Sequence, residues 1–246
     1  MTQPRTCLLI TGQDADSFLQ GLITNDINKL DQGMIYAAIL TPQGKYLADF
    51  FLSRHGQDVL MDIDTSLAAN LTQRLTMYKL RADVAITPID LNMHRGIDAT
   101  PPDGFADPRH PALGWRAYRD TPQTPDDTNW PALQVAHCVP QTGVELTPDS
   151  YILEVGFERL NGVDFRKGCY VGQEVTARMK HKTQLRKGLT TVTVNGPATP
   201  GTPITADGKP VGTLHTRAGD RAIAYLRFDR AGAAMMAGDA NVIWNS

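Results

Sequence analysis

Cysteine is scarce in this sequence. Only Cys7, Cys138 and Cys169 occur among the 246 residues, and no two of them lie close together. The odd number and the wide spacing exclude a disulfide framework and a CxxC metal knuckle. Unpaired thiols are typical of a reducing compartment, so the sequence predicts a cytoplasmic protein.

Long apolar runs are missing as well. No stretch approaches the roughly 18 residues that a membrane-spanning helix needs. The opening residues, MTQPRTCLLI, contain neither a basic segment nor a long apolar one. We therefore expect no signal peptide and no membrane partner.

Net charge is close to zero, because 24 lysines and arginines are set against 26 aspartates and glutamates. Such a balance gives no overall field that would favour nucleic acid, which is therefore not an expected partner. A binding site for an anion would have to come from a local cluster of basic residues. The 41% apolar and 20% charged residues are typical of a globular protein with one large domain or two modest ones.

Helical and strand-like patterns alternate along the first part of the chain. The predicted elements are a helix (13–24), a hairpin (34–53), a strand (58–64), a helix (67–78) and a strand (81–89). Asp14 is expected to cap the first helix, and Pro88 to close the last strand. This order predicts an α+β fold rather than a regularly alternating parallel sheet.

The pattern changes twice further along the chain. Prolines crowd residues 95–131, where we expect loops with one short strand at 114–118. The apolar segment Leu133–Val139 is expected to be buried. From Gly188 onward, short strand-like segments separated by glycine and proline predict a small barrel or sandwich. The expected domains are residues 1–182 and 183–246, with the boundary near 183–188.

The run KGCYVGQE, residues 167–174, has the pattern of a chemical site. Gly168 and Gly172 bracket Cys169 and suit a tight turn with unusual backbone angles. The following Gln173–Met179 segment is predicted to be helical, with Glu174 in its first turn. Cys169 would then precede a helix N-terminus, where backbone N–H groups favour a thiolate.

Basic residues crowd around this run. Between residues 166 and 187 the one acidic residue is Glu174, whereas the basic ones are Arg166, Lys167, Arg178, Lys180, Lys182, Arg186 and Lys187. A cysteine in such surroundings has its pKa lowered from about 8.5 by about one unit or more. We therefore predict that Cys169 is partly ionised near neutral pH.

Each of these residues also has an ordinary structural interpretation. A lone cysteine is most often a small buried hydrophobic residue, and this is what we expect of Cys7 and Cys138. A cap, turn or surface role is the ordinary explanation for Asp26, Asp49 and Asp62. His137 and His181 are isolated in the sequence. The aspartates remain potential ligand-binding or acid–base groups, and neither histidine is interpreted as a metal ligand.

The motif resembles the signature of the YgfZ family of folate-binding proteins, bacterial relatives of mitochondrial proteins that assist the maturation of 4Fe–4S enzymes. The residues that fit are Lys167, Gly168, Cys169, Tyr170, Gly172, Gln173, Glu174 and the later Arg178. The preceding LNGVDF fits as well. Residues 12–52 and 78–86 are similar to the glycine-cleavage T-protein superfamily, and KPVGTLH is similar to its C-terminal barrel. The resemblance does not extend to residues 92–128.

This resemblance implies ferredoxin-like layers around a central folate channel, followed by a small C-terminal β-barrel. It implies tetrahydrofolate or a derivative as the ligand, with no permanently bound metal. The residues implied as folate contacts are Asn25, Asp26, Tyr78 and Arg81. The implied partners are folate and iron–sulfur assembly or client proteins.

In the same interpretation, Cys169 acts as a thiolate that reacts near folate or transiently binds iron. Lys167 would tune the thiol, while Gln173 and Glu174 would order the loop. A cluster is usually held by about four thiolates, so ligation by Cys169 would require a partner protein or an external thiol.

The sequence also departs from the T-proteins. It has no Arg-Thr-Gly-Tyr-Thr-Gly-Glu segment, and Gln134 and Ala136 stand where those enzymes tend to have arginine and glutamate, if Pro140 anchors the alignment. These departures favour an iron–sulfur accessory factor over an aminomethyltransferase. Two alternatives remain open: a folate-dependent one-carbon transferase, and an RNA-binding module for tRNA modification that uses the basic run 178–187.

Overall fold

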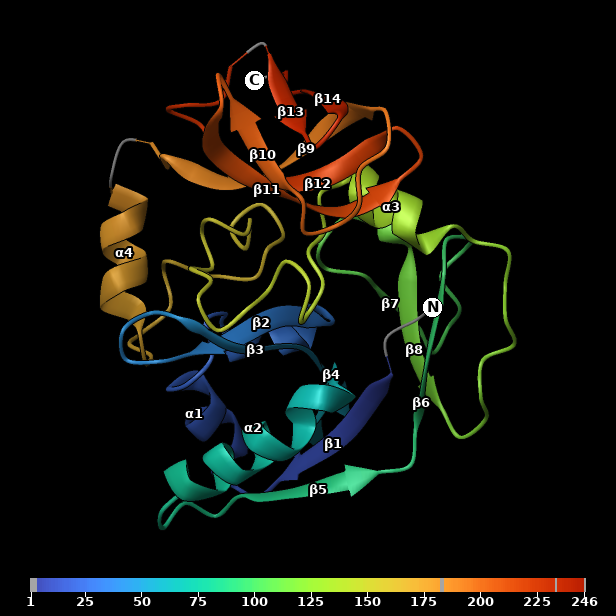
Figure 1. Ribbon diagram of the computed structural model, residues 1–246. Helices are drawn as coiled ribbons and strands as arrows, with labels where there is room; N and C mark the ends of the chain where they lie inside the picture. Colours follow the sequence, from blue (N-terminus) through green and yellow to red (C-terminus); the bar gives the residue numbers. More distant parts are fainter. Residues whose placement is uncertain (1–3, 182–183, 233, 246) are drawn as a thin grey trace. The chain divides into compact units, whose positions relative to one another are not determined.

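The computed structural model describes residues 4–181, 184–232 and 234–245 (Figure 1). The chain forms two compact units. The N-terminal unit consists of the described residues up to Thr128 together with Glu158–Val175, and the barrel unit consists of Asn129–Phe157 with the described residues from Thr176 onward. The predicted domain boundary at 182/183 lies outside the described residues.

A five-stranded antiparallel sheet forms the centre of the N-terminal unit, in the order β2-β3-β4-β1-β5. Its strands are β1 (Arg5–Thr11), β2 (Ile35–Leu40), β3 (Tyr46–His55), β4 (Asp58–Asp64) and β5 (Ala85–Ile89). The predicted hairpin and the strand after it are confirmed. Pro88 was expected to close β5 but lies within it, which is tolerated because β5 is at the edge of the sheet.

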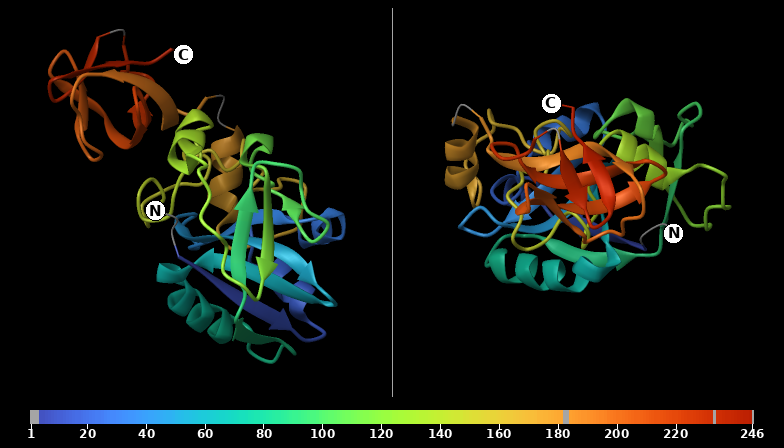
Figure 2. Two further views of the ribbon diagram at one scale, coloured as in Figure 1. Left: turned by 90° about the vertical axis from the view of Figure 1, so that its right-hand side faces the viewer. Right: turned by 45° about the horizontal axis from the view of Figure 1, so that its top comes forward.

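One face of this sheet is apolar because every second residue of its strands is a large hydrophobic residue. Leu8, Phe50 and Met61 from this face pack with Leu19 and Leu75 in one core. The latter two come from α1 (Ala15–Gln20) and α2 (Thr65–Tyr78), and the 3-10 helix η1 (Ile27–Gln32) contributes to the same core. Figure 2 shows α2 along one side of the sheet.

The first helix is shorter than predicted and differs at its start. It ends before Gly21, so the predicted span of 13–24 was too long. Asp14 stands at the expected capping position, but its carboxylate makes no capping hydrogen bond. It accepts instead from the backbone N–H of Asp83 at 2.8 Å, which fixes the start of α1 to the segment before β5.

A second, three-stranded antiparallel sheet has the order β6-β8-β7, and contains β6 (Asn92–Gly96), β7 (Phe105–Ala106) and β8 (Trp115–Arg119). The short 3-10 helix η2 (Pro111–Leu113) precedes β8. The strand predicted at 114–118 is confirmed as β8, whereas β6 and β7 were not predicted. Arg116 and Tyr118 alternate along β8 and both reach Asp62 of β4, on the face of the large sheet opposite to the helices.

The barrel unit contains a closed six-stranded barrel in the order β10-β11-β12-β9-β14-β13, which confirms the predicted C-terminal barrel (Figure 1). Its strands are β9 (Lys187–Asn195), β10 (Pro203–Ala206), β11 (Lys209–Ala218), β12 (Arg221–Arg227), β13 (Met235–Ala237) and β14 (Ala240–Ile243). Helix α3 (Trp130–Ala136) packs against it, since Val135 and Cys138 share a cluster with Ile223.

The last helix is α4 (Gln173–His181), which begins in the N-terminal unit and confirms the helix predicted after the cysteine motif. The mixed fold of layers plus a barrel is therefore as predicted. Within the described residues, none of the helices combines the length and apolar character required to span a membrane.

Candidate functional site

Cys169 differs from the other two cysteines in its exposure. Its residue is exposed, whereas Cys7 and Cys138 are buried, as predicted. Burial raises the pKa of Cys7 to about 12, with a further contribution from the charge of Asp62. Cys7 therefore stays protonated and shielded, and Cys169 is the thiol that solvent reagents and partner molecules can reach.

The loop that carries Cys169 is fixed by Gly172. This residue has φ = 84°, a conformation that glycine adopts without strain. A Cβ at Gly172 would lie 2.5 Å from the carbonyl oxygen of Thr41 and 2.9 Å from Cβ of Leu40. A Cβ at Gly44, in the β2–β3 turn, would lie 2.7 Å from Cβ of Val175. The cysteine loop and this turn therefore pack backbone against backbone.

Gly168 does not share this role, which corrects the expectation that both glycines need unusual angles. It is not among the residues with positive φ, and a Cβ built there would meet nothing within 4 Å. The open space beside Gly168 lies directly before Cys169 in the chain. The glycine thus leaves the neighbourhood of the thiol uncrowded rather than shaping the turn.

The start of α4 orders the other side of the loop. The backbone N–H of Gln173 donates to the carbonyl of Tyr170 at 3.2 Å, and the Gln173 side chain accepts from the N–H of Tyr170 at 3.3 Å. Glu174 lies exposed in the first turn and Arg178 exposed near the last turn. Each charge suits the helix dipole at its end.

Lys167 is not part of an exposed basic surface, although it belongs to the basic run of the sequence. It is buried, and its ammonium donates to the carbonyl oxygens of Gln20 at 2.7 Å and Ile23 at 2.6 Å. It also lies 5.1 Å from the centre of the Tyr170 ring. Lys167 therefore fastens the cysteine loop to the end of α1. Of the other predicted basic residues, Lys182 lies outside the described residues.

The burial of Lys167 predicts a specific pH dependence of stability. Burial lowers its pKa from 10.5 to about 8, against the opposing charges of Asp26 and Asp164. Between these values the unfolded chain binds more protons than the folded chain, so stability rises with pH. We expect the free energy of unfolding of the native chain, relative to Lys167→Met, to increase from pH 8 to pH 10.5 and to be level below that window. Parallel curves for the two proteins in denaturant titrations would show that this assignment is wrong.

The segment before the motif is fastened to the same region. The N–H of Asp164 donates to the carbonyl of Thr24, and the hydroxyl of Thr24 donates to the carbonyl of Gly162 at 2.6 Å. Asp164 also pairs with Lys29 at 2.7 Å. Asn161, with φ = 55°, donates its amide to the carbonyl of Pro108 at 2.9 Å. This segment is thus held to two parts of the unit that are distant in sequence, one near Thr24 and Lys29 and the other at Pro108.

The predicted folate contacts fall into two groups. Asn25 donates its amide to the carbonyls of Tyr36 and Asn161, and Asp26 caps η1 by accepting from the N–H of Asn28. Both lie beside the cysteine loop. Tyr78 packs against the apolar core on the helix side of the large sheet, and Arg81 is exposed between α2 and β5. The structure therefore gives Asn25 and Asp26 local structural roles and places Tyr78 elsewhere in the unit.

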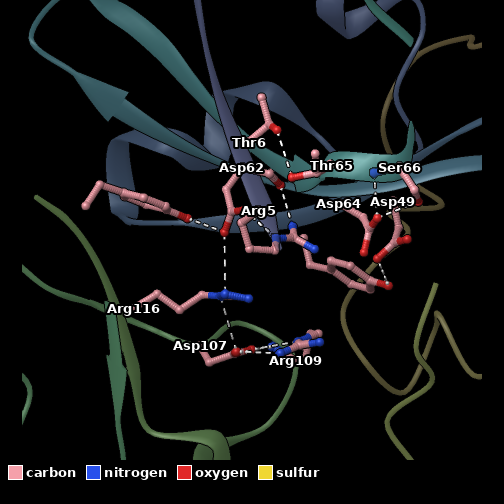
Figure 3. Close-up of polar contacts among 12 residues, drawn as sticks. Arg5, Thr6, Asp49, Asp62, Asp64, Thr65, Ser66, Asp107, Arg109 and Arg116 are labelled. Carbon is pink, nitrogen blue, oxygen red and sulfur yellow. Dashed lines mark hydrogen bonds and ion pairs between the residues drawn. The ribbon is translucent and has the colours of Figure 1, made fainter. Parts of the chain in front are cut away.

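A buried layer of arginines and aspartates covers the other face of the large sheet (Figure 3). Nε of Arg5 lies 2.5 Å from Asp62, whose side chain is fully buried. Asp62 also accepts from the Tyr118 hydroxyl at 2.9 Å and from Arg116 at 3.4 Å. Burial alone would raise the pKa of Asp62, but the charges of Arg5 and Arg116 outweigh it and hold the pKa below 3.8.

The layer continues through a second carboxylate. Asp107 accepts from Nε and a terminal nitrogen of Arg109 at 3.0 and 2.8 Å, and lies 3.7 Å from Nε of Arg116. Burial would raise the pKa of Asp107, yet Arg109 and Arg116 hold it below its ordinary value. The guanidinium carbons of Arg116 and Arg109 lie 3.8 and 4.7 Å from the centre of the Phe51 ring.

Asp49 occupies the same face and is held by two tyrosines. Its carboxylate accepts from the hydroxyl of Tyr36 at 3.0 Å and from that of Tyr46 at 2.5 Å. Sequence reasoning singled out Asp49 and Asp62 but missed the arginines. One available signal was Arg5, a charge at the start of an otherwise apolar strand.

The described residues contain no group of three or more histidine, cysteine or acidic side chains arranged to hold a metal ion. His137 follows α3 as its C-cap residue, and His181 is exposed at the end of α4.

Comparison with known proteins identifies the barrel. Residues 186–245 match the family of CAF17 C-terminal beta-barrel domains. The chain is 31% identical to the mitochondrial iron–sulfur cluster assembly factor IBA57 homologue of Mycosarcoma maydis, over 75% of this chain and 54% of that protein. It therefore spans about half the length of this fungal relative. The mouse and human IBA57 proteins are 28% and 29% identical, and 75% of each is covered.

The chain is thus similar to IBA57-type iron–sulfur cluster assembly factors. Its fold is also that of a glycine-cleavage T-protein. The aminomethyltransferase T of Bartonella henselae superposes with a TM-score of 0.76, over 97% of this chain and 81% of that one, at 11% identity. At this identity the likeness shows the fold alone.

The cytoplasmic location predicted from the sequence is contradicted by these relatives, which are mitochondrial proteins by name. The prediction used unpaired cysteines, and these indicate only a reducing compartment. They do not distinguish one such compartment from another.

Proposed function

We propose that this chain is an accessory factor for iron–sulfur proteins and that it acts through the thiolate of Cys169. The observation that carries the proposal is one exposed thiol on a loop that Lys167 and Gly172 hold in place. The likeness to proteins named iron–sulfur cluster assembly factors supports it. A thiolate is both a nucleophile and a good iron ligand.

The thiol would act transiently rather than store a cluster. A cluster usually needs about four thiolate ligands. The described residues offer no group of three potential ligands, and Cys169 is their only exposed cysteine. The remaining ligands would come from a partner protein or from a small thiol, so Cys169 would take part in transfer or repair.

A reduced folate, as in YgfZ-type proteins, is the ligand that we propose for the N-terminal unit. A pterin is flat and needs an apolar surface with a few polar anchors. Asp49, which the hydroxyls of Tyr36 and Tyr46 hold on the face of the large sheet opposite to the helices, is the polar anchor that we propose for it. Because both Asp49 oxygens already accept tyrosine hydroxyls, the arrangement favours binding over proton transfer in a one-carbon transferase.

The proposal is tested by the reactivity of the native thiols. An alkylating reagent should label Cys169 and spare Cys7 and Cys138, since only Cys169 is exposed. Labelling is followed by mass spectrometry against pH, with and without tetrahydrofolate under anaerobic conditions. We expect the rate of Cys169 labelling to be limited by the fraction of thiolate. We also expect this rate to be lower when tetrahydrofolate is bound. An unreactive Cys169 would refute the thiol proposal, and a rate unchanged by tetrahydrofolate, together with no calorimetric binding, would refute the folate proposal.

A further inference from the structure

The cysteine loop is held at both of its ends, by different parts of the N-terminal unit. Lys167 holds the first end through hydrogen bonds to carbonyls at the end of α1. Gly172 forms the second end and lies against the turn between β2 and β3, since a Cβ built there would lie 3.2 Å from Cα of Gly44. Only residues 168–171 separate the two ends. The place of Cys169 therefore depends on both contacts.

The β2–β3 turn has a defined shape at this contact. Gly44 has φ = 76°, and its backbone N–H donates to the carbonyl of Thr41 at 2.8 Å. The same carbonyl oxygen is the atom that a Cβ at Gly172 would meet at 2.5 Å. The pairing of β2 with β3 shifts register between Ile39 and Leu40, just before the turn. Such a bulge increases the local twist and redirects the backbone that follows it.

A side chain at position 44 would not fit through a change of rotamer. A Cβ at Gly44 would lie 2.7 Å from Cβ of Val175. The Cβ of valine is attached to the backbone, so no rotation of the side chain would move it away. Carbon atoms make contact at about 3.5–4.0 Å, so the backbone would have to move by roughly 1 Å. Val175 lies in the first turn of α4, directly after the cysteine loop.

We propose that Gly44 is a positioning residue for Cys169. Without a side chain at position 44, the β2–β3 turn can meet the start of α4 and hold the second end of the cysteine loop, so that the thiol keeps one position. A misplacement of about 1 Å can slow a reaction about a hundredfold. This inference rests on the proposed function, in which Cys169 is the reacting group.

Gly44→Ala is compared with Gly56→Ala, its matched control in the β3–β4 turn. Gly56 has φ = 62°, but a Cβ there would meet nothing within 4 Å. Both substitutions carry the cost of an alanine at positive φ, and only Gly44→Ala adds the clash. The readout is hydrogen exchange of the intact chain, followed by mass spectrometry on peptides that contain Tyr170 and Gln173, whose N–H groups are hydrogen-bonded within the loop. We expect exchange to be about fivefold faster or more in Gly44→Ala and unchanged in Gly56→Ala.

Two further measurements separate positioning from stability alone. Support of a 4Fe–4S enzyme in cells should fall about fivefold or more for Gly44→Ala and stay near native for Gly56→Ala. Adding Val175→Gly removes the Cβ that position 44 would strike, so the double variant should regain the exchange rate of Val175→Gly alone. This comparison keeps the test decisive if Gly44→Ala by itself does not fold.

The inference is overturned if Gly44→Ala lowers Tm more than Gly56→Ala does while loop exchange and enzyme activity match those of the control. It is also overturned if Val175→Gly does not restore the exchange rate. A failure of the proposed function would be seen differently, as full enzyme activity with Cys169→Ala. The exchange rates of the loop do not depend on that result, so the two failures are distinguishable.

Discussion

Asp62→Asn is expected to destabilise the chain by about 3–5 kcal/mol, the usual cost of removing one partner of a buried ion pair. The Asp62 side chain is fully buried and stands between Arg5 and Arg116. Asparagine keeps the shape but not the charge, so Arg5 and Arg116 lose the buried carboxylate that they share. The loss would be measured as the free energy of unfolding in urea at neutral pH.

The control is Asp58→Asn, at the start of the same strand, which should change stability by less than about 0.5 kcal/mol. Adding Arg116→Met to Asp62→Asn should restore part of the loss, because one orphaned charge is removed. The pKa of Asp62 is lowered in the folded state, so its contribution is full above pH 4 and is lost as pH falls below the unfolded value of about 3.9. A loss near that of Asp58→Asn would show that the layer does not contribute as the geometry indicates.

Local sequence patterns predicted the helices and strands that are determined by residues close together in the chain. The hairpin of β2 and β3 follows from the TPQG turn between apolar runs, and α2 from leucines at helical spacing. The exposure of Cys169 and burial of Cys7 and Cys138 were also predicted, since the two buried residues lie in apolar company. The barrel followed from short strands separated by turn residues.

Long-range contacts account for what could not be predicted. Lys167 appears in the sequence among basic residues, but its hydrogen bonds are to carbonyls at the end of α1. The Arg–Asp layer joins Arg5, Asp62 and Arg116, which are far apart in the chain. Strands β6 and β7 are short, so their formation depends on pairing with β8 rather than on their own pattern.

Cys169→Ala is expected to abolish support of cluster enzymes in cells while leaving the fold intact. The side chain is exposed, so its loss should change the free energy of unfolding by less than about 0.5 kcal/mol. The thiolate, by contrast, has no substitute among the described residues, since the other two cysteines are buried. A large loss of function with little loss of stability would indicate that the thiol takes part in the chemistry rather than in the fold.

Cys138→Ala is the matched control, because it removes a thiol by the same substitution from a buried position in the barrel unit. The measurement is the activity of a 4Fe–4S enzyme in cells whose own copy of the gene is deleted and which express each variant at equal level. We predict activity near that of the deletion for Cys169→Ala, and near that of the native chain for Cys138→Ala. Full enzyme activity with Cys169→Ala would contradict the proposal that the chain acts through this thiol.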